Sequence, residues 1–234
     1  MKISSIISSA VISIGLLALG LCVRSGLKSF TDSQRKVEVK GLCEREVPAN
    51  QVTWPIVFSL GGSNLPDLYS KVESTNKQII NFLTENGVTA DEVSVSAPKL
   101  SENTDSYNYK PGITPPYTIT STVTVSSDKV ELVRGLITRQ GDLLSQGIPV
   151  VSQDYGNTIT YSFTDLNSIK PEMIAEATQN AREAANKFAE DSDSKLGKIF
   201  NAKQGQFSIT DRDNFTPYIK TVRVVTSLTY LLED

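Results

Sequence analysis

Histidine is absent from this 234-residue chain, and cysteine and tryptophan are scarce, with two cysteines and one tryptophan. Without histidine the chain lacks the commonest general base, the commonest metal ligand and the side chain that titrates near neutral pH. Catalysis by a Ser-His-Asp or Cys-His arrangement is therefore excluded. Catalysis by a Ser-Lys pair is not excluded by composition, but the chain has no Gly-x-Ser-x-Gly elbow. We therefore expect a protein that is not an enzyme.

The two cysteines give the soluble part no disulfide framework, because Cys22 lies inside an apolar N-terminal segment and Cys43 is then alone. Cys43 is followed by Glu44 and Arg45, and this mixed charge gives no clear activation of a thiolate. We predict a half-buried cysteine in a strand. A disulfide to another subunit is the alternative.

Dense positive charge is also missing. The formal net charge is -3, and the first 24 residues hold two bases, Lys2 and Arg24, and no acid. The rest of the chain therefore carries -5, the difference between -3 and +2. Arg35-Lys36 is the only adjacent basic pair. Since phosphate binding needs a dense Lys/Arg surface, we expect no nucleic-acid partner.

Ile3–Val23 is a stretch of 21 residues without charge. As a helix it would span about 32 Å, which matches a bilayer core of about 30 Å. It is a signal anchor that holds the protein on the membrane through residues 3–23, or a cleaved signal peptide with a passable site at Ala18-Leu19-Gly20. A lipoprotein site at Cys22 fits badly because Leu21 precedes it. Each alternative places the rest of the chain outside the cytoplasm.

The remaining sequence divides into a linker at residues 25–36 and one domain at residues 37–234. Alternating and helical hydrophobic patterns predict its elements. The expected strands are 36–44, 52–60, 92–100, 117–126, 147–151, 158–163, 205–210 and 221–232. The expected helices are 66–85, closed by Asn86-Gly87, a helix with its apolar face between Val130 and Leu144, and 168–191. This order favours an α+β sandwich of a largely antiparallel sheet with packed helices, after an N-terminal transmembrane segment.

Two of these elements have clear faces. The strand Tyr117–Ser126 places threonines on its wet face, and the small residues of the longest helix predict close packing on a sheet. We predict an inner stripe on that helix formed by Ile174, Ala177, Ala181, Ala184 and Phe188. Ser127 is expected to cap the helix that follows it.

Four stretches match a known pattern in their order and spacing. They are Val37–Gly41, Leu83–Val88 with Asp91-Glu92-Val93, Tyr117–Val125, and the Ala-rich Ala177–Leu196 closed by Leu196-Gly197. Together they resemble the SIMPL-domain family of bacterial periplasmic and cell-surface proteins. The chain departs from the pattern at Ala49-Asn50-Gln51-Val52 and in the polar insert of residues 190–195.

The resemblance implies an extracytoplasmic envelope protein that self-associates, sometimes into ring-like assemblies, with a loose link to stress tolerance. With it, we expect the domain on the periplasmic side of the inner membrane if the segment is an anchor, or in the periplasm or cell envelope if the segment is cleaved. It implies no catalytic residue. We therefore expect a non-enzymatic homo-oligomer, with contacts nearest to the strands Tyr117–Ser126 and Thr221–Leu232, since sheet edges need to be covered. The alternative is a monomeric binding or adaptor module that docks a protein partner through residues 101–116.

Aromatic residues and prolines in the loop Ser101–Pro116 are typical of a contact surface. Tyr107, Tyr109 and Tyr117 are the candidate interface residues.

Gly61-Gly62-Ser63-Asn64 could cradle an anion but is more simply interpreted as a strand-to-helix turn. Asp191, Asp193, Asp211 and Asp213 have the spacing of calcium ligands without the required glycine and distal glutamate. We expect no metal and no cofactor.

Overall fold

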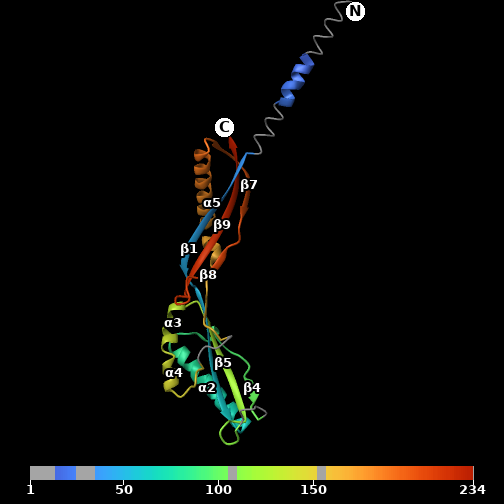
Figure 1. Ribbon diagram of the computed structural model, residues 1–234. Helices are drawn as coiled ribbons and strands as arrows, with labels where there is room; N and C mark the ends of the chain where they lie inside the picture. The colour runs from blue at the N-terminus through green and yellow to red at the C-terminus, as the bar shows by residue number, and fades with distance from the viewer. Residues whose placement is uncertain (1–13, 25–34, 105–109, 152–156, 234) are drawn as a thin grey trace, which may run out of the picture. The chain divides into compact units, whose positions relative to one another are not determined.

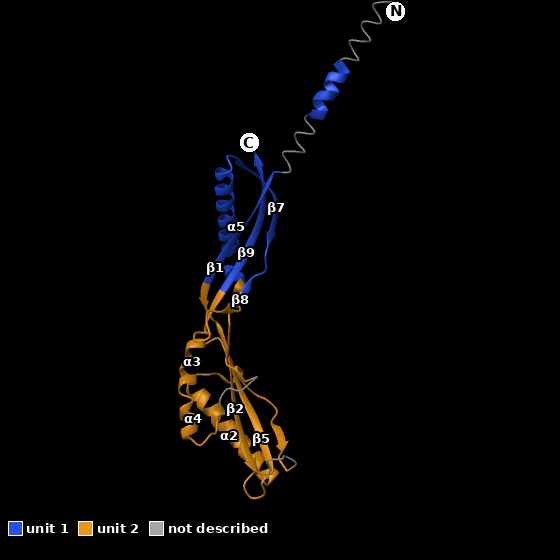
Figure 2. Ribbon diagram, viewed as in Figure 1, with its two compact units in different colours: residues 1–45, 167–208, 222–234 blue, residues 46–166, 209–221 orange. Residues whose placement is uncertain are grey.

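The structure, a computed structural model, describes residues 14–24, 35–104, 110–151 and 157–233. The chain forms two compact units (Figure 1, Figure 2). Unit 1 consists of residues 1–45, 167–208 and 222–234, and unit 2 consists of residues 46–166 and 209–221. Two of the four boundaries fall inside strands β1 (Lys36–Pro48) and β9 (Ile219–Glu233), and the other two fall after the first residue of α5 (Leu166–Asp191) and of β8 (Ser208–Asp211). Antiparallel sheets with packed helices confirm the predicted α+β class.

The sheet of unit 2 has the strand order β3-β5-β2-β6, and β4 also pairs with β5. Its strands are β2 (Gln51–Gly62), β3 (Val93–Val95), β4 (Lys99–Glu102), β5 (Tyr117–Ser127) and β6 (Thr160–Ser162). β2 and β5 pair antiparallel from Val52 opposite Ser127 to Gly62 opposite Tyr117. The buried side chains of β2 include Trp54, Ile56 and Phe58, the face that the alternation predicted.

Helix α2 (Leu65–Glu85) packs against this sheet. The Asn64 side chain accepts a hydrogen bond from the backbone N–H of Asp67, so Gly61–Asn64 forms the predicted strand-to-helix turn. Gly87 ends the helix with φ at +95°, as the Asn-Gly pair predicted. The buried residues include the four predicted ones, Leu68, Val72, Ile79 and Leu83.

The helix expected between Val130 and Leu144 is broken. It forms α3 (Val130–Thr138) and α4 (Gly141–Ser145). The N–H groups of Arg139 and Gln140 bond to carbonyls three residues back, which tightens the chain and changes the phase of the residues that follow. Leu143 is therefore buried, and the predicted Leu144 is 54% exposed.

Three of the expected strands in unit 2 are shorter than predicted. The strand at 92–100 is replaced by a 3₁₀ turn (Ala90–Glu92), β3 and β4. Pro98 lies between β3 and β4 and has no N–H for the ladder. Residues 147–151 contribute a single bridge between Val150 and Phe58, and residues 158–163 give only β6.

The sheet of unit 1 has the order β1-β9-β7, and β8 (Ser208–Asp211), most of which belongs to unit 2, also pairs with β9. β7 (Lys195–Gln204) was not predicted, because its sequence does not alternate and its pairing with β9 contains two register shifts. We expected β5 and β9 to lie near sheet edges that another subunit would cover. Both strands instead lie in the interior of their sheets. Both strands have neighbours on either side, so neither offers a sheet edge to another subunit.

Helix α5 (Leu166–Asp191) covers one face of the unit 1 sheet (Figure 1). Its buried residues recur every four positions: Met173, Ala177, Ala181, Ala185 and Ala189. Ala177 and Ala181 were predicted correctly, and Ile174 and Ala184 are half-buried. The prediction for Phe188 is wrong, because its side chain is 60% exposed. From Ala177 to Ala189 the buried positions of this stripe all hold alanine, and the larger Phe188 falls beside them.

Residues 14–24 are helical, and the first part of the predicted apolar segment lies outside the described residues. Among the helices that the structure describes, none is long and apolar enough to cross a membrane.

Candidate binding groove

The threonines of β5 face away from the hydrophobic core of unit 2. Thr118, Thr120, Thr122 and Thr124 are half-buried and alternate with the buried Ile119, Ser121, Val123 and Val125. The buried set points to α2, with which it forms the core. The opposite face of the sheet is therefore rich in hydroxyl groups, as the alternation predicted.

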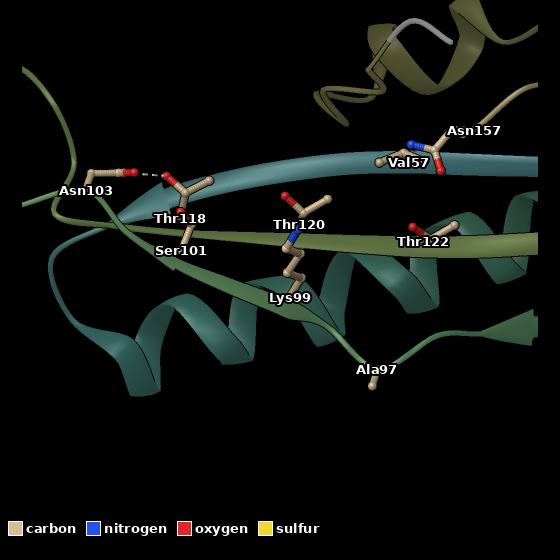
Figure 3. A pocket seen from close by; sticks show the side chains of 9 residues that line it. All are labelled: Val57, Ala97, Lys99, Ser101, Asn103, Thr118, Thr120, Thr122 and Asn157. Atoms are coloured by element: carbon tan, nitrogen blue, oxygen red, sulfur yellow. Dashed lines mark hydrogen bonds between the residues drawn. The ribbon is translucent and has the colours of Figure 1, made fainter. Parts of the chain in front are cut away.

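A groove of about 520 Å³ lies over this threonine face (Figure 3). The described residues that line it come from β2, β4, β5 and the segments beside them: Val57, Ala97, Lys99, Ser101, Asn103, Thr118, Thr120, Thr122 and Asn157. Six of these nine side chains carry a hydroxyl or an amide, one is cationic and none is a carboxylate. The volume lies within the range of small-molecule sites.

Lys99 supplies the positive charge of this lining. Its side chain extends from β4 toward Thr120 (Figure 3). None of the ion pairs between described residues includes Lys99. The ammonium group is therefore open to a negatively charged group that enters the groove.

Hydrogen bonds hold one end of the groove in place. The Asn103 side-chain amide donates to Thr118 Oγ1 at 2.8 Å and to the Pro115 carbonyl at 2.9 Å, and its backbone N–H donates to the Pro116 carbonyl at 2.8 Å. Thr120 Oγ1 lies 2.8 Å from Ser59 Oγ. Within the described part of the chain, Thr122 and Ser101 make no side-chain hydrogen bond, so both hydroxyls are available to a ligand.

The structure describes only one of the three candidate interface tyrosines. Tyr107 and Tyr109 lie outside the described residues. Tyr117 is the first residue of β5, pairs with Gly62 and Glu102, and packs half-buried against the core of unit 2. In the described part of the loop, Ile113 is 80% exposed at the tip of a turn closed on the Lys110 carbonyl. An interface role for the tyrosines stays a prediction.

Glu92 lies at the centre of a second polar cluster in unit 2. Its carboxylate accepts hydrogen bonds from Ser127 Oγ at 2.6 Å, from Thr89 N at 2.7 Å and Oγ1 at 2.8 Å, and from Lys129 Nζ at 3.1 Å. The bond from Ser127 is the largest cause that lowers the pKa of Glu92 to about 2. Ser127 also accepts from the Lys129 backbone N–H at 3.0 Å, just before α3. This geometry joins the 3₁₀ turn to β5 and is structural.

Three of the four acidic residues with calcium-like spacing, Asp191, Asp211 and Asp213, have other partners. Asp191 pairs with Lys187 at 2.8 Å, and Asp211 pairs with Lys220. Asp213 accepts bonds from the backbone N–H groups of the two residues at 215 and 216, both at 2.7 Å. The Thr216 hydroxyl is the largest cause that lowers its pKa to about 2. Within the described residues, no group of three His, Cys, Asp or Glu side chains is placed to hold a metal ion.

Cys43 lies in β1, in unit 1, and is 1% exposed. The strand position was predicted, but the burial is greater than expected. Burial is the main cause that raises the pKa of this thiol to about 11, and the hydrogen bond with Glu176 adds to it. Almost no thiolate is therefore present at neutral pH, which disfavours disulfide exchange.

The sequence alone indicated only part of the groove. The Thr/apolar alternation of β5 predicted the hydroxyl-rich face. Lys99 lies in the strand predicted at 92–100, whereas Asn103 and Asn157 come from segments without a periodic pattern, and pairing of β4 with β5 brings Lys99 and Asn103 beside the threonines. No local signal in the sequence could have placed them there.

The structure defines an α+β protein with a polar, open groove on one sheet. A family model for SIMPL, described as "Protein of unknown function (DUF541)", matches residues 37–224. The chain therefore belongs to the SIMPL family, which confirms the resemblance inferred from the four motifs. A comparison with curated proteins finds no match.

Proposed function

We propose that this chain is a non-enzymatic protein of the bacterial cell envelope that self-associates outside the cytoplasm. The observation that carries the proposal is the second face of the unit 1 sheet. α5 packs on one face, whereas the side chains of β1 on the other face are exposed, including Leu42 at 42%. The ring of Phe200, 58% exposed, lies beneath Lys36 on the same face, with Nζ 3.5 Å from the ring centroid.

The outer strands of this sheet are poor templates for edge-to-edge pairing. β7 carries Lys195, Lys198 and Lys203 and two register shifts, both of which are devices that discourage pairing. On β1, the Leu42 carbonyl accepts a hydrogen bond from the Asn180 side chain of α5 at 2.8 Å. We therefore propose contact through the face that holds Leu42 and Phe200, in place of the strand edges first expected.

Analytical ultracentrifugation of the full chain in detergent, at several concentrations, tests self-association. We expect a concentration-dependent oligomer that Phe200→Ser weakens about tenfold or more, because buried aromatic residues dominate interface energies. Phe215→Ser is the matched control, since Phe215 is an exposed phenylalanine of unit 2. A wild-type chain that stays monomeric at the highest concentration would contradict the proposal.

A monomeric binding module is the second candidate function, and the groove favours it. Asn103 joins the groove to the loop 101–116, so a protein partner docked on that loop would lie beside the groove. A monomer that binds a ligand in the groove would support this function over self-association.

The proposed location rests on the uncharged segment 3–23, and a role in stress tolerance rests only on the family resemblance. We expect the full-length chain to sediment with membranes and to resist high-salt and carbonate washing. A soluble product that begins near Leu21 would show instead that the segment is a cleaved signal peptide.

A further inference from the structure

We propose that the groove over β5 binds an acidic oligosaccharide. The groove lies wholly among residues of unit 2, and the proposal does not depend on self-association. The described residues of its lining supply one ammonium group, which forms no ion pair with another described residue, and a row of hydroxyl and amide groups, with no carboxylate among them. Each part of this lining selects against a different class of ligand.

The charge of the lining favours an anion. Lys99 has no carboxylate partner among the described residues, and none of the described lining residues is acidic and would repel a negative ligand. A hydrogen bond from an ammonium to a carboxylate is stronger than one between neutral groups. A divalent cation is disfavoured, because hard cations take carboxylate and carbonyl oxygens at several positions. A single cation among the described lining residues is also too few for a nucleic-acid backbone.

The polar groups of the lining favour a ligand with many hydroxyls. Thr118, Thr120 and Thr122 recur every second residue and form a row about 13 Å long. Ser101 and Asn157 carry further hydroxyl and amide groups that bond to no other described side chain. Every hydroxyl can both donate and accept, so such a row matches a chain of sugar hydroxyls.

Apolar surface is too small in this groove for a lipid tail. Among the lining residues that the structure describes, only Val57 and Ala97 are apolar, and Val57 is buried. A ligand held here is therefore recognised through hydrogen bonds and charge. An acidic oligosaccharide combines a repeated hydroxyl pattern with a carboxylate for Lys99.

Isothermal titration calorimetry on the full chain in detergent tests this assignment. The probes are trigalacturonic acid, the neutral maltotriose and inorganic phosphate. We expect trigalacturonic acid to bind at least about tenfold more tightly than either of the others, because hydrogen bonds to charged groups exceed neutral ones. We expect Lys99→Gln to remove this preference for the acid, and Thr122→Val to weaken binding of the acid severalfold.

Lys71→Gln is the matched control, because Lys71 is an exposed lysine on α2 and does not line the groove. The proposal is overturned if the wild-type chain binds none of the probes, or if Lys99→Gln binds the acid as tightly as the wild type. Equal affinities for phosphate and trigalacturonic acid would also overturn it, since the groove would then recognise negative charge and not the sugar hydroxyls. Analytical ultracentrifugation of the Lys99→Gln variant measures its oligomeric state. Because Lys99 lies outside the proposed self-association face, we expect the variant to associate like the wild type whatever its ligand binding, so the two proposals fail independently.

Discussion

Gly41 of β1 lies directly against the backbone of α5 at Ala181. A Cβ atom built on Gly41 would lie 2.4 Å from Ala181 N, 2.8 Å from Ala181 Cβ and 1.8 Å from the Ala177 carbonyl oxygen. Atoms this close cannot be accommodated by rotating a side chain, because two of the three belong to the backbone. The helix approaches the sheet at a distance that only glycine permits at this position.

Gly41→Ala is therefore expected to destabilise the protein. The added methyl group has to push α5 from the sheet, and overpacking of this kind costs about 1–3 kcal/mol, or more when backbone has to move. Urea denaturation followed by circular dichroism measures the change. Gly135→Ala is the matched control: nothing lies within 4 Å of a Cβ on Gly135 in helix α3, so this change should be neutral or stabilising.

Ala181→Leu tests the same contact from the helix side. Ala181 is fully buried against the sheet, so three extra carbons should cost about 1–3 kcal/mol. Ala175→Leu, at an exposed position of the same helix, should be nearly silent. Equal melting temperatures for the two variants would show that the packing of α5 on the sheet has been misjudged.

Local patterns predicted the elements of the fold better than their neighbours in space. Strong alternation in β5 and β9, and the start and end signals of α2, gave these elements within two residues of their observed ends. β7 was missed because register shifts interrupt its alternation. The interior positions of β5 and β9 depend on pairing between distant segments, and a hydrophobic pattern does not state which strand is the neighbour.

The same limit applies to side-chain environment. Phe188 was assigned to the inner stripe of α5 because it is apolar, yet the contact at Gly41 requires small residues there. Tertiary packing therefore decides a position that the composition of the helix alone leaves open.

Glu92→Gln should lower stability by about 1–3 kcal/mol at neutral pH, since the ionised carboxylate accepts several short hydrogen bonds. The pKa of Glu92 is lowered from 4.5 to about 2 in the folded protein. The ionised group therefore contributes its full stabilisation above about pH 4.5 and loses it as the pH falls toward 2. The difference between wild type and variant should shrink over that window.

Urea denaturation at a series of pH values measures this difference. Glu85→Gln is the control, because Glu85 is exposed at the end of α2 and forms no ion pair or side-chain hydrogen bond with another described residue. Its effect should stay within about 0.5 kcal/mol at every pH. A difference for Glu92→Gln that does not change between pH 5 and pH 2 would show that the charge of Glu92 is not stabilising.

Removal of metal ions should leave the melting temperature of the full chain unchanged. Asp211 and Asp213 are the acidic residues best placed to contradict this expectation, and both already pair with Lys220, Arg212 or Thr216. Calorimetry with and without a chelator measures the effect, and adding back calcium is the control. A drop in melting temperature that calcium reverses would reveal a calcium site in this chain.

Asn103→Ala should loosen the loop that Asn103 closes. The Asn103 side chain donates to the Pro115 carbonyl and to Thr118 Oγ1, so its removal leaves one end of the loop without these bonds. We expect faster hydrogen exchange at Ile113 and Thr114, whose N–H groups bond to the Lys110 carbonyl, and a loss of about 1 kcal/mol in stability.

Mass-spectrometric hydrogen exchange of the full chain measures this effect peptide by peptide. Asn81→Ala is the matched control, because Asn81 is exposed on α2 and its side chain bonds to no other described residue. The control should leave exchange in the loop unchanged. The strands β2 and β5 should keep their protection in both variants, since Asn103 takes no part in their pairing. If Asn103→Ala exchanges like the wild type at Ile113 and Thr114, the turn at Lys110 holds the loop without help from Asn103.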